Sequence, residues 1–412
     1  MKAAILTIGD ELLNGQTIDT NSAWIGIELA KVGVEVTAKM SVSDQDESIR
    51  MGLDVLYKSA AVVLVTGGLG PTQDDVTKKS LAKYFEDELV FSNETYDRLS
   101  NMFEKRGRKP LEAHRQQCML PNTAELIINK RGTAPGMWMQ KGGKYLLSMP
   151  GVPAEMKGIM TDGGLDIIAK LNPDIHIDYR IIKTAGIGES MIAERIADIL
   201  KSLPAYQSIA YLPGRASVKL RLTAIGSDAA QIESDNDQVA FQIKEILGDF
   251  VYASGDHTLQ EVVGQLALQK GWMIGTAESC TGGHIAQLIT SISGSSRYYK
   301  GSVIAYANEI KTDILNVASA SLEQHGAVSE QVVEEMISGL LAHLNLDVGI
   351  AVSGIAGPTG GTPQKPVGTI WIAVGDRNRT ETKKLSLSKD RQLNIEYTAI
   401  YALDMLRRFL MN

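Results

Sequence analysis

Cysteine is scarce in this chain, with only Cys118 and Cys280 among 412 residues. Two cysteines so far apart in sequence form neither a disulfide framework nor a Cys-x-x-Cys metal motif, which favours a reducing compartment. No histidine stands four residues from another or beside a cysteine, so zinc chemistry of the HExxH or Cys/His type is not expected. A GxSxG nucleophile elbow is missing as well.

Long apolar runs and an excess of positive charge are also missing. No segment approaches the roughly 20 apolar residues that span a bilayer. The apolar run at the N-terminus, of about six residues, is too short for a signal peptide. The net charge of -7 argues against general binding to nucleic acid. We therefore expect a cytoplasmic protein that binds no membrane, with nucleic acid not an expected partner.

The pattern of apolar residues predicts an α/β protein. Within residues 1–172, apolar runs at 3–8, 34–40 and 62–65 are typical of buried strands, and helical patterns separate them. Strands that alternate with helices over short connections form a parallel, doubly wound sheet. We expect this fold for the first domain.

Polar residues mark the predicted starts of two helices in this domain. Asn21 precedes a helical pattern at 22–32, and Asp44 precedes another that ends near residue 59. Both side chains are favourable N-caps, because their oxygens accept hydrogen bonds from the first backbone N–H groups of a helix. The sequence therefore predicts capping roles for Asn21 and Asp44.

The rest of the chain forms two further parts. Residues 173–254 follow the order β-α-β-β-α-β, which is typical of a small split α+β domain, and we interpret it as a connecting or dimerising domain. Residues 255–412 again alternate strands and helices, with a hairpin expected at 369–387 and glycine loops after the strands. A length of 412 residues is compatible with these three domains.

A glycine-rich segment, Thr-Gly-Gly-Leu-Gly-Pro-Thr-Gln-Asp-Asp at 66–75, follows the third strand. Glycines let the backbone approach a ligand, and a helix start favours a phosphate. Asp74 and Asp75 could hold a divalent metal on that phosphate. Asp10 and Glu11 leave the first strand at the same carboxyl edge, where ligands bind in such sheets. The alternative is an ordinary turn whose acidic residues favour the helix dipole.

Hydroxyl and thiol groups also gather in the glycine loops of the last domain. Candidates for a nucleophile are Ser279, Cys280 and Ser296, and Lys311 could act as the base if its pKa is lowered. The N–H groups of the glycine loops could form an oxyanion hole for acyl transfer. Serines in such loops are often only turn residues, and buried thiols are mostly inert.

The segments that carry these residues resemble one family along essentially the whole chain. They are GDELLNG, GGLGPTQDDVT, GTAPGM, PGVPAEM, TAGIGES, AYLPGRASVKLRLTA, AESCTGG, GSS, YANEIK and SGIAGPTGG. Together they are similar to the competence/damage-inducible protein CinA family. The resemblance implies a molybdopterin-binding-like domain with a metal-dependent ADP-ribose pyrophosphatase activity. It also implies a KH-like domain and a C-terminal nicotinamide-nucleotide amidohydrolase, which converts nicotinamide mononucleotide to nicotinate mononucleotide and ammonia.

The resemblance also implies site residues and partners. It implies a divalent metal (Mg, Mn or Co) for the first domain, no cofactor for the amidase, and a cytoplasmic homodimer. The implied metal ligands are Asp10, Glu11, Asp74 and Asp75, beside a phosphate-facing loop of Gly67, Gly68, Gly70 and Thr72. The implied catalytic residues are Ser296, Tyr306 and Lys311, and the implied substrate-binding residues are Ser279, Thr281, Gly282, Ser353, Gly354 and Arg391. The choice between Ser296 and Ser279 as nucleophile stays open.

The residues together with the resemblance imply two functions of different classes. The first is a bifunctional nucleotide hydrolase in pyridine-nucleotide salvage, with nicotinamide mononucleotide and ADP-ribose as substrates. The alternative is a non-catalytic protein that holds a pterin or a nucleotide and contacts nucleic acid during competence. A molybdenum-cofactor enzyme is a third interpretation of the fold, but a fold alone does not fix a function.

Overall fold

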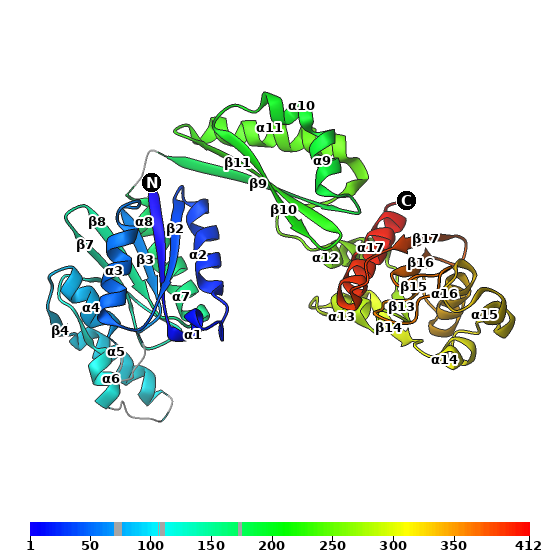
Figure 1. The fold of residues 1–412 in the computed structure, drawn as a ribbon, viewed down its shortest axis with the longest axis horizontal. Coiled ribbons are helices and arrows are strands. Elements are labelled where there is room, and N and C mark those ends of the chain that lie inside the picture. The colour runs from blue at the N-terminus through cyan, green and yellow to red at the C-terminus, as the bar shows by residue number, and fades with distance from the viewer. Residues whose placement is uncertain (70–75, 106, 108–111, 172–174) are drawn as a thin grey trace. The chain divides into compact units, whose positions relative to one another are not determined.

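The structure is a computed structural model that describes residues 1–69, 76–105, 107, 112–171 and 175–412. The chain divides into two compact units, which are described separately (Figure 1). One unit holds Met1–Asp178 with Ile225–Ile232, and the other holds Tyr179–Ala224 with Glu233–Asn412. In the described ranges, no helix combines the length and the apolar character needed to cross a membrane.

The N-terminal domain alternates strands and helices from its first residues, as the sequence predicts. Its elements are β1 (Lys2–Ile8), α1 (Asp10–Leu13), α2 (Thr20–Lys31), β2 (Glu35–Val42), α3 (Asp46–Leu56), β3 (Val62–Thr66), α4 (Thr77–Tyr84), β4 (Leu89–Phe91), α5 (Asn93–Glu104), α6 (Glu112–Gln117), β5 (Met119–Pro121), β6 (Glu125–Ile127), β7 (Gly136–Lys141), β8 (Lys144–Met149), α7 (Pro153–Ile159), the π-helix η1 (Met160–Gly164) and α8 (Leu165–Ala169).

Six of these strands form one sheet in the order β2-β1-β3-β8-β7-β6. The strands β2, β1, β3 and β8 are parallel, and β7 and β6 are antiparallel additions. Successive side chains of a strand point to opposite faces. Leu6 and Val63 therefore pack with the cluster under α3 and α4, whereas Ile5 and Leu64 pack with the cluster under α2 and α7. Figure 1 shows α2 and α3 on opposite sides of the central strands.

The order of these strands places a crevice at the ends of β1 and β3. The chain moves from β1 to β2 on one side and then crosses to β3 on the other. Ligands in open α/β sheets bind at such a switch point, beyond the carboxyl ends of the strands. Gly67 leaves β3 there with φ +113°, and its N–H donates to Met149 O at 3.1 Å.

Replacing Gly67 by alanine is expected to destabilise the N-terminal domain by about 3 kcal/mol or more. An added Cβ would lie 2.1 Å from the carbonyl oxygen of Ile8, and φ is unfavourable for any L side chain. Gly142→Ala is the matched control, because Gly142 has φ +56° but no atom within 4 Å of an added Cβ. Hydrogen exchange of the β1 and β3 amides in the full chain measures both. Equal protection in the two variants would contradict the expectation.

Two predicted helix caps are placed differently by the structure. The helix α2 begins at Thr20 and is capped by Asp19, whose carboxylate accepts from Ser22 N at 2.9 Å. Asn21 therefore lies inside the first turn. The helix α3 begins at Asp46 after Gln45, so Asp44 is also not its cap. The sequence contains several polar residues at each start, and only packing decides which of them caps.

The middle domain has the predicted order of strands and helices. Its elements are β9 (His176–Ala185), α9 (Glu189–Arg195), α10 (Ala197–Ser202), β10 (Gln207–Gly214), β11 (Ser217–Gly226), α11 (Ala229–Leu247), the 3-10 helix η2 (Gly248–Phe250) and β12 (Val251–Ser254). The strand order is β10-β11-β9-β12, and the helices lie on one side of the sheet (Figure 1). Ile182, Ile192, Leu220 and Ile243 are among the buried residues between them.

The C-terminal domain is a second, independent α/β sheet. Its elements are α12 (Leu259–Lys270), β13 (Ile274–Glu278), α13 (His284–Thr290), the 3-10 helix η3 (Ser295–Arg297), β14 (Tyr299–Ile304), α14 (Asn308–Asp313), α15 (Ser319–His325), α16 (Glu330–Leu344), β15 (Val348–Gly354), β16 (Thr369–Gly375), β17 (Thr380–Ser386) and α17 (Arg391–Met411). The order is β14-β13-β15-β16-β17, with β14, β13 and β15 parallel and β16–β17 forming the expected hairpin.

Candidate functional site

A pocket of about 200 Å³ opens at the carboxyl edge of the C-terminal sheet. It lies where β13 and β15 end, which is the switch point of this sheet and a usual place for a ligand. The lining comes from the residues after β13, from the segment after β14 with α14, from the connection between α15 and α16, from the end of β15 and from the start of α17: Ser279, Cys280, Tyr306, Asn308, Lys311, Ala327, Val328, Ser353, Gly354, Ala356 and Arg391.

Ser279 and Lys311 meet in this pocket. Lys311 Nζ donates to Ser279 Oγ at 3.2 Å, and both side chains are buried. Lys311 Nζ also donates to the backbone carbonyls of Ala305, at 2.7 Å, and Tyr306, at 3.4 Å. A neutral amine has two hydrogens and one lone pair, so it can keep both carbonyl bonds and accept the Ser279 proton. The pair thus has the geometry of a nucleophile and its general base.

Burial sets the proton affinities around this pair. Desolvation lowers the pKa of Lys311, because the ammonium form loses its hydration inside the domain, and the neighbouring Cys280 opposes this change. The same burial raises the pKa of the Cys280 thiol to about 12. A lysine with a lowered pKa is a better base near neutral pH, whereas a thiol with a raised pKa stays protonated. These directions favour Ser279 over Cys280 as the nucleophile.

Ser296 and Lys311 lie at opposite ends of the strand β14. Ser296 belongs to η3, which precedes β14, whereas Lys311 follows β14. The strand between them has six residues. A strand of that length extends about 20 Å. Ser296 is exposed and does not line the pocket. The geometry therefore does not support the choice of Ser296 as nucleophile and favours Ser279 instead.

Arg391 and Tyr306 form the polar mouth of the pocket. Arg391 is the first residue of α17, and its guanidinium donates to Gly357 O at 3.0 Å and to the Tyr306 hydroxyl at 3.1 Å. Tyr306 is 61% exposed. Lys311 contacts Tyr306 through the backbone carbonyl only, as far as the hydrogen bonds of the described residues show. The Tyr306 hydroxyl is thus placed beside Arg391, rather than beside the base that the resemblance pairs with it.

The other predicted substrate-binding residues belong to the same loops. Ser353, near the end of β15, donates from its hydroxyl to a backbone carbonyl before α16 at 2.6 Å, and Gly354 follows it in the pocket wall. Thr281 and Gly282 form the turn after the proposed nucleophile but do not line the pocket. The Thr281 hydroxyl is buried and has no hydrogen-bond partner in the described part of the chain.

Two residues of this site were missed from the sequence. Asn308 lines the pocket from the first position of α14, where an asparagine is ordinarily understood as part of a helix start. Glu278 is fully buried directly before Ser279. The sequence does contain a signal for Glu278. A glutamate at the end of a buried strand needs hydrogen-bond donors around it, and this indicates a structural or functional role.

A second pocket, of about 280 Å³, lies at the switch point of the N-terminal sheet. The lining comes from the residues at the ends of β1, β2, β3 and β8, from α1, from the first turn of α2 with the segment before it, and from the start of α7: Thr7, Ile8, Gly9, Glu11, Leu12, Thr17, Ile18, Asp19, Thr20, Asn21, Asp44, Thr66, Gly67, Gly68, Gly151 and Pro153. The predicted loop residues Gly67 and Gly68 and the predicted acid Glu11 therefore meet in one place.

Asn21 joins three segments of this pocket. Its Nδ2 donates to Gly151 O at 2.7 Å and to Thr66 Oγ1 at 3.2 Å, and Thr66 Oγ1 in turn donates to Pro150 O at 3.0 Å. Its Oδ1 is buried without a hydrogen-bond partner among the described residues. The residue that the sequence offers as a helix cap thus holds the wall of the pocket.

Acidic residues face each other at the other wall. Asp44 Oδ2 accepts from the backbone N–H of Asp10 at 3.3 Å. Burial raises the pKa of Asp44, and the negative charges of Asp10 and Glu11 add to the rise, while the bond from Asp10 N–H opposes it. The negative charges beside Asp44 therefore disfavour the charged form of that one carboxyl.

The expected metal site is only partly within the described residues. Gly70, Thr72, Asp74 and Asp75 lie outside them, so their roles stay predictions. In the described ranges, no three His, Cys, Asp or Glu side chains come close enough to hold a metal ion. The described carboxylates therefore do not form the metal site by themselves.

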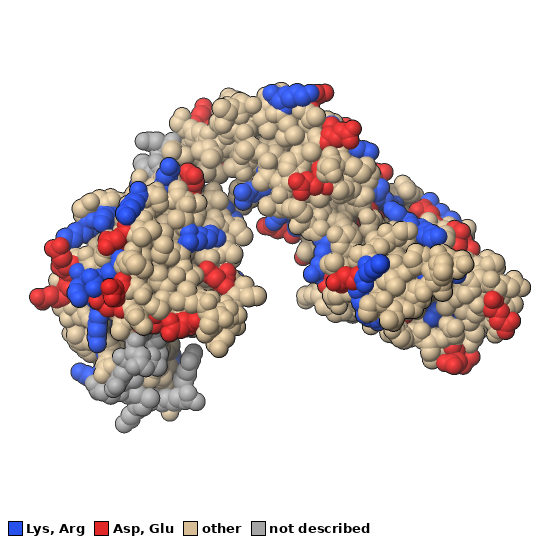
Figure 2. Space-filling view, viewed as in Figure 1, with Lys and Arg blue, Asp and Glu red and all other residues tan. Residues whose placement is uncertain are grey.

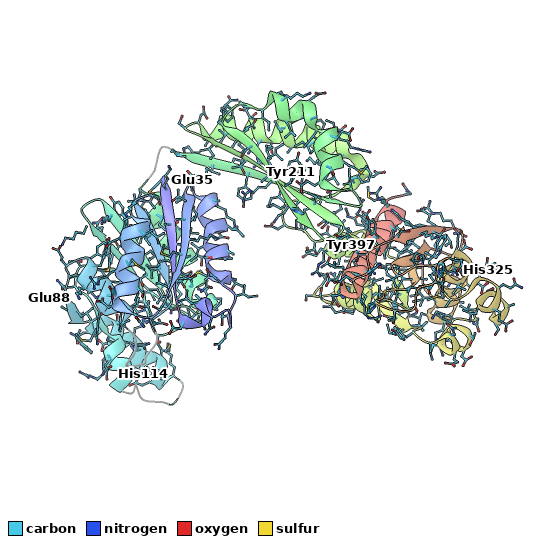
Figure 3. The ribbon with its side chains drawn as sticks, in the orientation of Figure 1. Glu35, Glu88, His114, Tyr211, His325 and Tyr397 are labelled. Carbon is cyan, nitrogen blue, oxygen red and sulfur yellow. The ribbon has the colours of Figure 1, made fainter. Side chains whose placement is uncertain are left out.

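Histidine lines neither pocket. Figure 3 shows His114 on α6 in one unit and His325 at the end of α15 in the other. Figure 2 shows acidic and basic side chains mixed over the visible face. Among the residues that the structure describes, Ser279 and Lys311 form a pair with the geometry of nucleophilic catalysis.

Three family models match the chain in succession. Residues 4–169 match a probable molybdopterin binding domain, residues 179–253 match the damage-inducible protein CinA KH domain, and residues 256–410 match the CinA C-terminal domain. The fold and these matches define a three-domain protein with a molybdopterin-binding-like domain, a KH-like domain and a CinA C-terminal domain.

Two relatives match over nearly the whole length of both chains. A CinA-like protein from Cytophaga hutchinsonii is 46% identical over 98% of this chain and 97% of its own. A CinA-like protein from Flavobacterium psychrophilum is 38% identical over 98% of both chains. Among solved structures, competence/damage inducible protein CihA from Agrobacterium tumefaciens is 36% identical, with a TM-score of 0.35, over 36% of this chain and 96% of its own. The chain belongs to the CinA family.

Proposed function

We propose that the C-terminal domain hydrolyses the carboxamide of nicotinamide mononucleotide to give nicotinate mononucleotide and ammonia. The observation that carries the proposal is the buried Ser279–Lys311 pair, with its 3.2 Å contact, in a pocket that has Arg391 at its mouth. A small amide on a phosphorylated carrier needs a nucleophile, a base and a cation for the phosphate, and this pocket contains all three.

The reaction follows from the bonding of Lys311. With Nζ neutral, Ser279 Oγ attacks the carboxamide carbon while its proton passes to Nζ. Lys311 then gives that proton to the amide nitrogen as the carbon–nitrogen bond breaks, ammonia leaves, and an ester on Ser279 remains. Water attacks this ester while Lys311 takes a proton from it, and Lys311 then gives that proton to Ser279 Oγ as the carbon–oxygen bond breaks. The products are the acid and ammonia, and the serine is regenerated.

The turn after Ser279 supplies candidate donors for the negative oxygen of the intermediate. Gly282 N–H donates back to Ser279 O at 3.2 Å, and Gly283 N–H is taken by Glu278 at 3.0 Å. The N–H groups of Cys280 and Thr281 lie between them, next to the nucleophile. Backbone donors in this position stabilise a tetrahedral oxyanion. We assign this role to the N–H groups of Cys280 and Thr281.

Arg391→Met is expected to raise the KM for nicotinamide mononucleotide about 10- to 100-fold with little change in kcat, because a charge-assisted bond to phosphate contributes about 1.5–3 kcal/mol. Nicotinamide riboside, which lacks the phosphate, should show no such rise. Steady-state kinetics on both compounds measure the difference. Tyr306→Phe is the control, since it removes the hydroxyl that Arg391 contacts and keeps the cation. An equal rise for the riboside would contradict a phosphate role.

For the N-terminal domain we propose a pyrophosphatase that cleaves ADP-ribose to AMP and ribose 5-phosphate. The support is the pocket at the switch point, with the glycines Gly67 and Gly68 beside Glu11 and Asp44. A divalent metal, Mg, Mn or Co, would neutralise the phosphate oxygens, with Asp74 and Asp75 as expected ligands. Both activities would belong to pyridine-nucleotide salvage. The homodimer and the cytoplasmic location also remain predictions.

One experiment tests both halves. The purified full chain is incubated with nicotinamide mononucleotide or with ADP-ribose, each with chelator or with added Mg, Mn or Co, and the products are identified by mass spectrometry. We expect deamidation with chelator present and cleavage of ADP-ribose only with metal. Absence of nicotinate mononucleotide would refute the amidase. Cleavage of ADP-ribose that persists in chelator would refute the metal-dependent pyrophosphatase.

A further inference from the structure

Glu278 is a buried carboxylate beside the proposed nucleophile. It ends β13, has 0% exposure and directly precedes Ser279. A carboxylate removed from water is costly unless donors replace its hydration. In the described part of the chain those donors are backbone N–H groups and one hydroxyl, so the charge is held by hydrogen bonds.

Both oxygens of Glu278 accept two hydrogen bonds each, mostly from the backbone that follows Ser279. Oε2 accepts from Gly283 N at 3.0 Å and from Ile285 N at 3.1 Å. Oε1 accepts from Ala286 N at 2.8 Å and from the Thr276 hydroxyl at 3.0 Å. Three of the four donors are backbone groups between the end of the turn and the first turn of α13. One side chain therefore ties the whole turn to the strand below it.

The turn needs this support because of its own backbone. Gly282 and Gly283 have φ of +60° and +98°, a conformation that glycine adopts easily but does not fix. Within the turn, Gly282 N donates to Ser279 O at 3.2 Å. The bonds of Glu278 hold the far end, so the position of Ser279 is set from both sides.

The same carboxylate is linked to the strand that leads to Lys311. The Thr276 hydroxyl, which donates to Glu278, lies 3.0 Å from the Tyr299 hydroxyl, and this lies 2.7 Å from Ser302 Oγ. Tyr299 and Ser302 belong to β14, and Lys311 follows that strand. A connected polar network thus runs beneath the loop, from the nucleophile strand to the base strand.

We propose that Glu278 is a positioning residue of this site. By holding the turn through Gly283, Ile285 and Ala286, it keeps Ser279 Oγ within reach of Lys311 and keeps the N–H groups of the turn directed at the substrate oxygen. It touches neither substrate nor the reacting atoms. The proposal rests on the proposed amidase function, and it adds a residue that the family resemblance does not bring into the site.

The test compares Glu278→Gln with Glu335→Gln in the full chain. Glutamine has the shape of glutamate, but its NH₂ group would face two hydrogen-bond donors. The variant therefore loses two of the four hydrogen bonds that Glu278 accepts. Glu335 is a matched control, because it also accepts a backbone bond (Ala318 N, 2.8 Å) and one hydroxyl bond (Ser321 Oγ, 2.6 Å) but lies outside the pocket. We expect Glu278→Gln to lower kcat about 100-fold with KM changed less than about threefold. The control should leave both constants within about threefold.

The outcomes separate this proposal from the function on which it rests. A wild-type chain that releases no ammonia refutes the amidase, and the positioning role with it. An active wild type with a Glu278→Gln variant that matches the control refutes the positioning role alone, as would a rise in KM without a fall in kcat. If Glu278→Gln does not fold, the variant Thr276→Val tests the proposal instead, because it removes one donor to Oε1. A several-fold fall in kcat at constant KM would support the proposal. An unchanged kcat would overturn it.

Discussion

Replacement of Ser279 by alanine is expected to lower kcat for release of ammonia from nicotinamide mononucleotide by about 10³-fold or more. The variant keeps Lys311 and the backbone donors but has no oxygen to attack the carboxamide. Direct attack by water is the only remaining route. Binding should survive, because Arg391 and the pocket walls are unchanged. Ammonia release measures the chemical step, and titration calorimetry with the nucleotide measures binding.

Ser296→Ala is the control for this result. Ser296 is exposed, precedes β14 and does not line the pocket, so its loss should leave kcat and KM near the wild-type values. If Ser296→Ala is inactive while Ser279→Ala is active, the nucleophile assignment made from this geometry is wrong. The site would then need Ser296 from another copy of the chain, because the length of β14 separates Ser296 from Lys311 within one chain.

Replacement of Lys311 by methionine is expected to cause a loss of similar size, about 10³-fold or more in kcat. Methionine is close to lysine in length but cannot take the Ser279 proton. The change also leaves the carbonyls of Ala305 and Tyr306 without this donor, which costs about 1–3 kcal/mol for each buried group. Stability must therefore be measured beside activity. Lys365→Met is the control, since Lys365 lies outside the pocket lining.

If Lys311 acts as the base, kcat/KM and stability should both change with pH in a direction that can be predicted. Burial lowers the pKa of Lys311, so the neutral amine is populated at a lower pH than for an ordinary lysine. The value of kcat/KM should rise with pH through that lowered pKa and then become constant. Stability should change in the same direction. The relevant pH window lies between the lowered pKa of Lys311 in the folded chain and its ordinary pKa in the unfolded chain. In that window the unfolded chain binds more protons, so the free energy of unfolding rises with pH.

Lys311→Met should lack both effects. Its residual kcat/KM should show no ascending limb from this group, and its stability should lose the rise with pH in that window. A fall in wild-type kcat/KM as pH rises through the window would contradict a neutral amine as the base. Rate profiles and denaturant unfolding across the pH range measure the two effects separately.

Much of the fold could be predicted from the sequence, because its signals are local. The runs 3–8 and 62–65 became β1 and β3 with at most one residue of difference at each end. Side chains on both faces of a buried parallel strand must be apolar, and this produces a recognisable run. The position of Gly67 and Gly68 in a pocket was also predictable, because a turn after such a strand lies at the edge of the sheet where ligands bind.

The site itself depended on information that the sequence does not contain. Ser279 and Ser296 both stand in glycine loops, and the sequence does not say that the end of β13 lies beside the end of β14, which brings Ser279 to Lys311. Strand direction and register decide this. Asn21 was assigned to a helix start for the same reason, because its contacts with Thr66 and Gly151 are made across 45 and 130 positions of sequence.

The position of β14 in its sheet divides the two halves of the Ser279–Lys311 pair. Ser279 follows β13, which has a neighbouring strand on each side, whereas Lys311 follows β14, the outermost strand of the sheet. The carbonyls that hold Lys311 belong to residues 305 and 306, just after that outer strand. A change in sequence along this outer strand would therefore act first on the residues that hold Lys311, and it would reach the turn after Ser279 through the contacts of Tyr299 with Thr276.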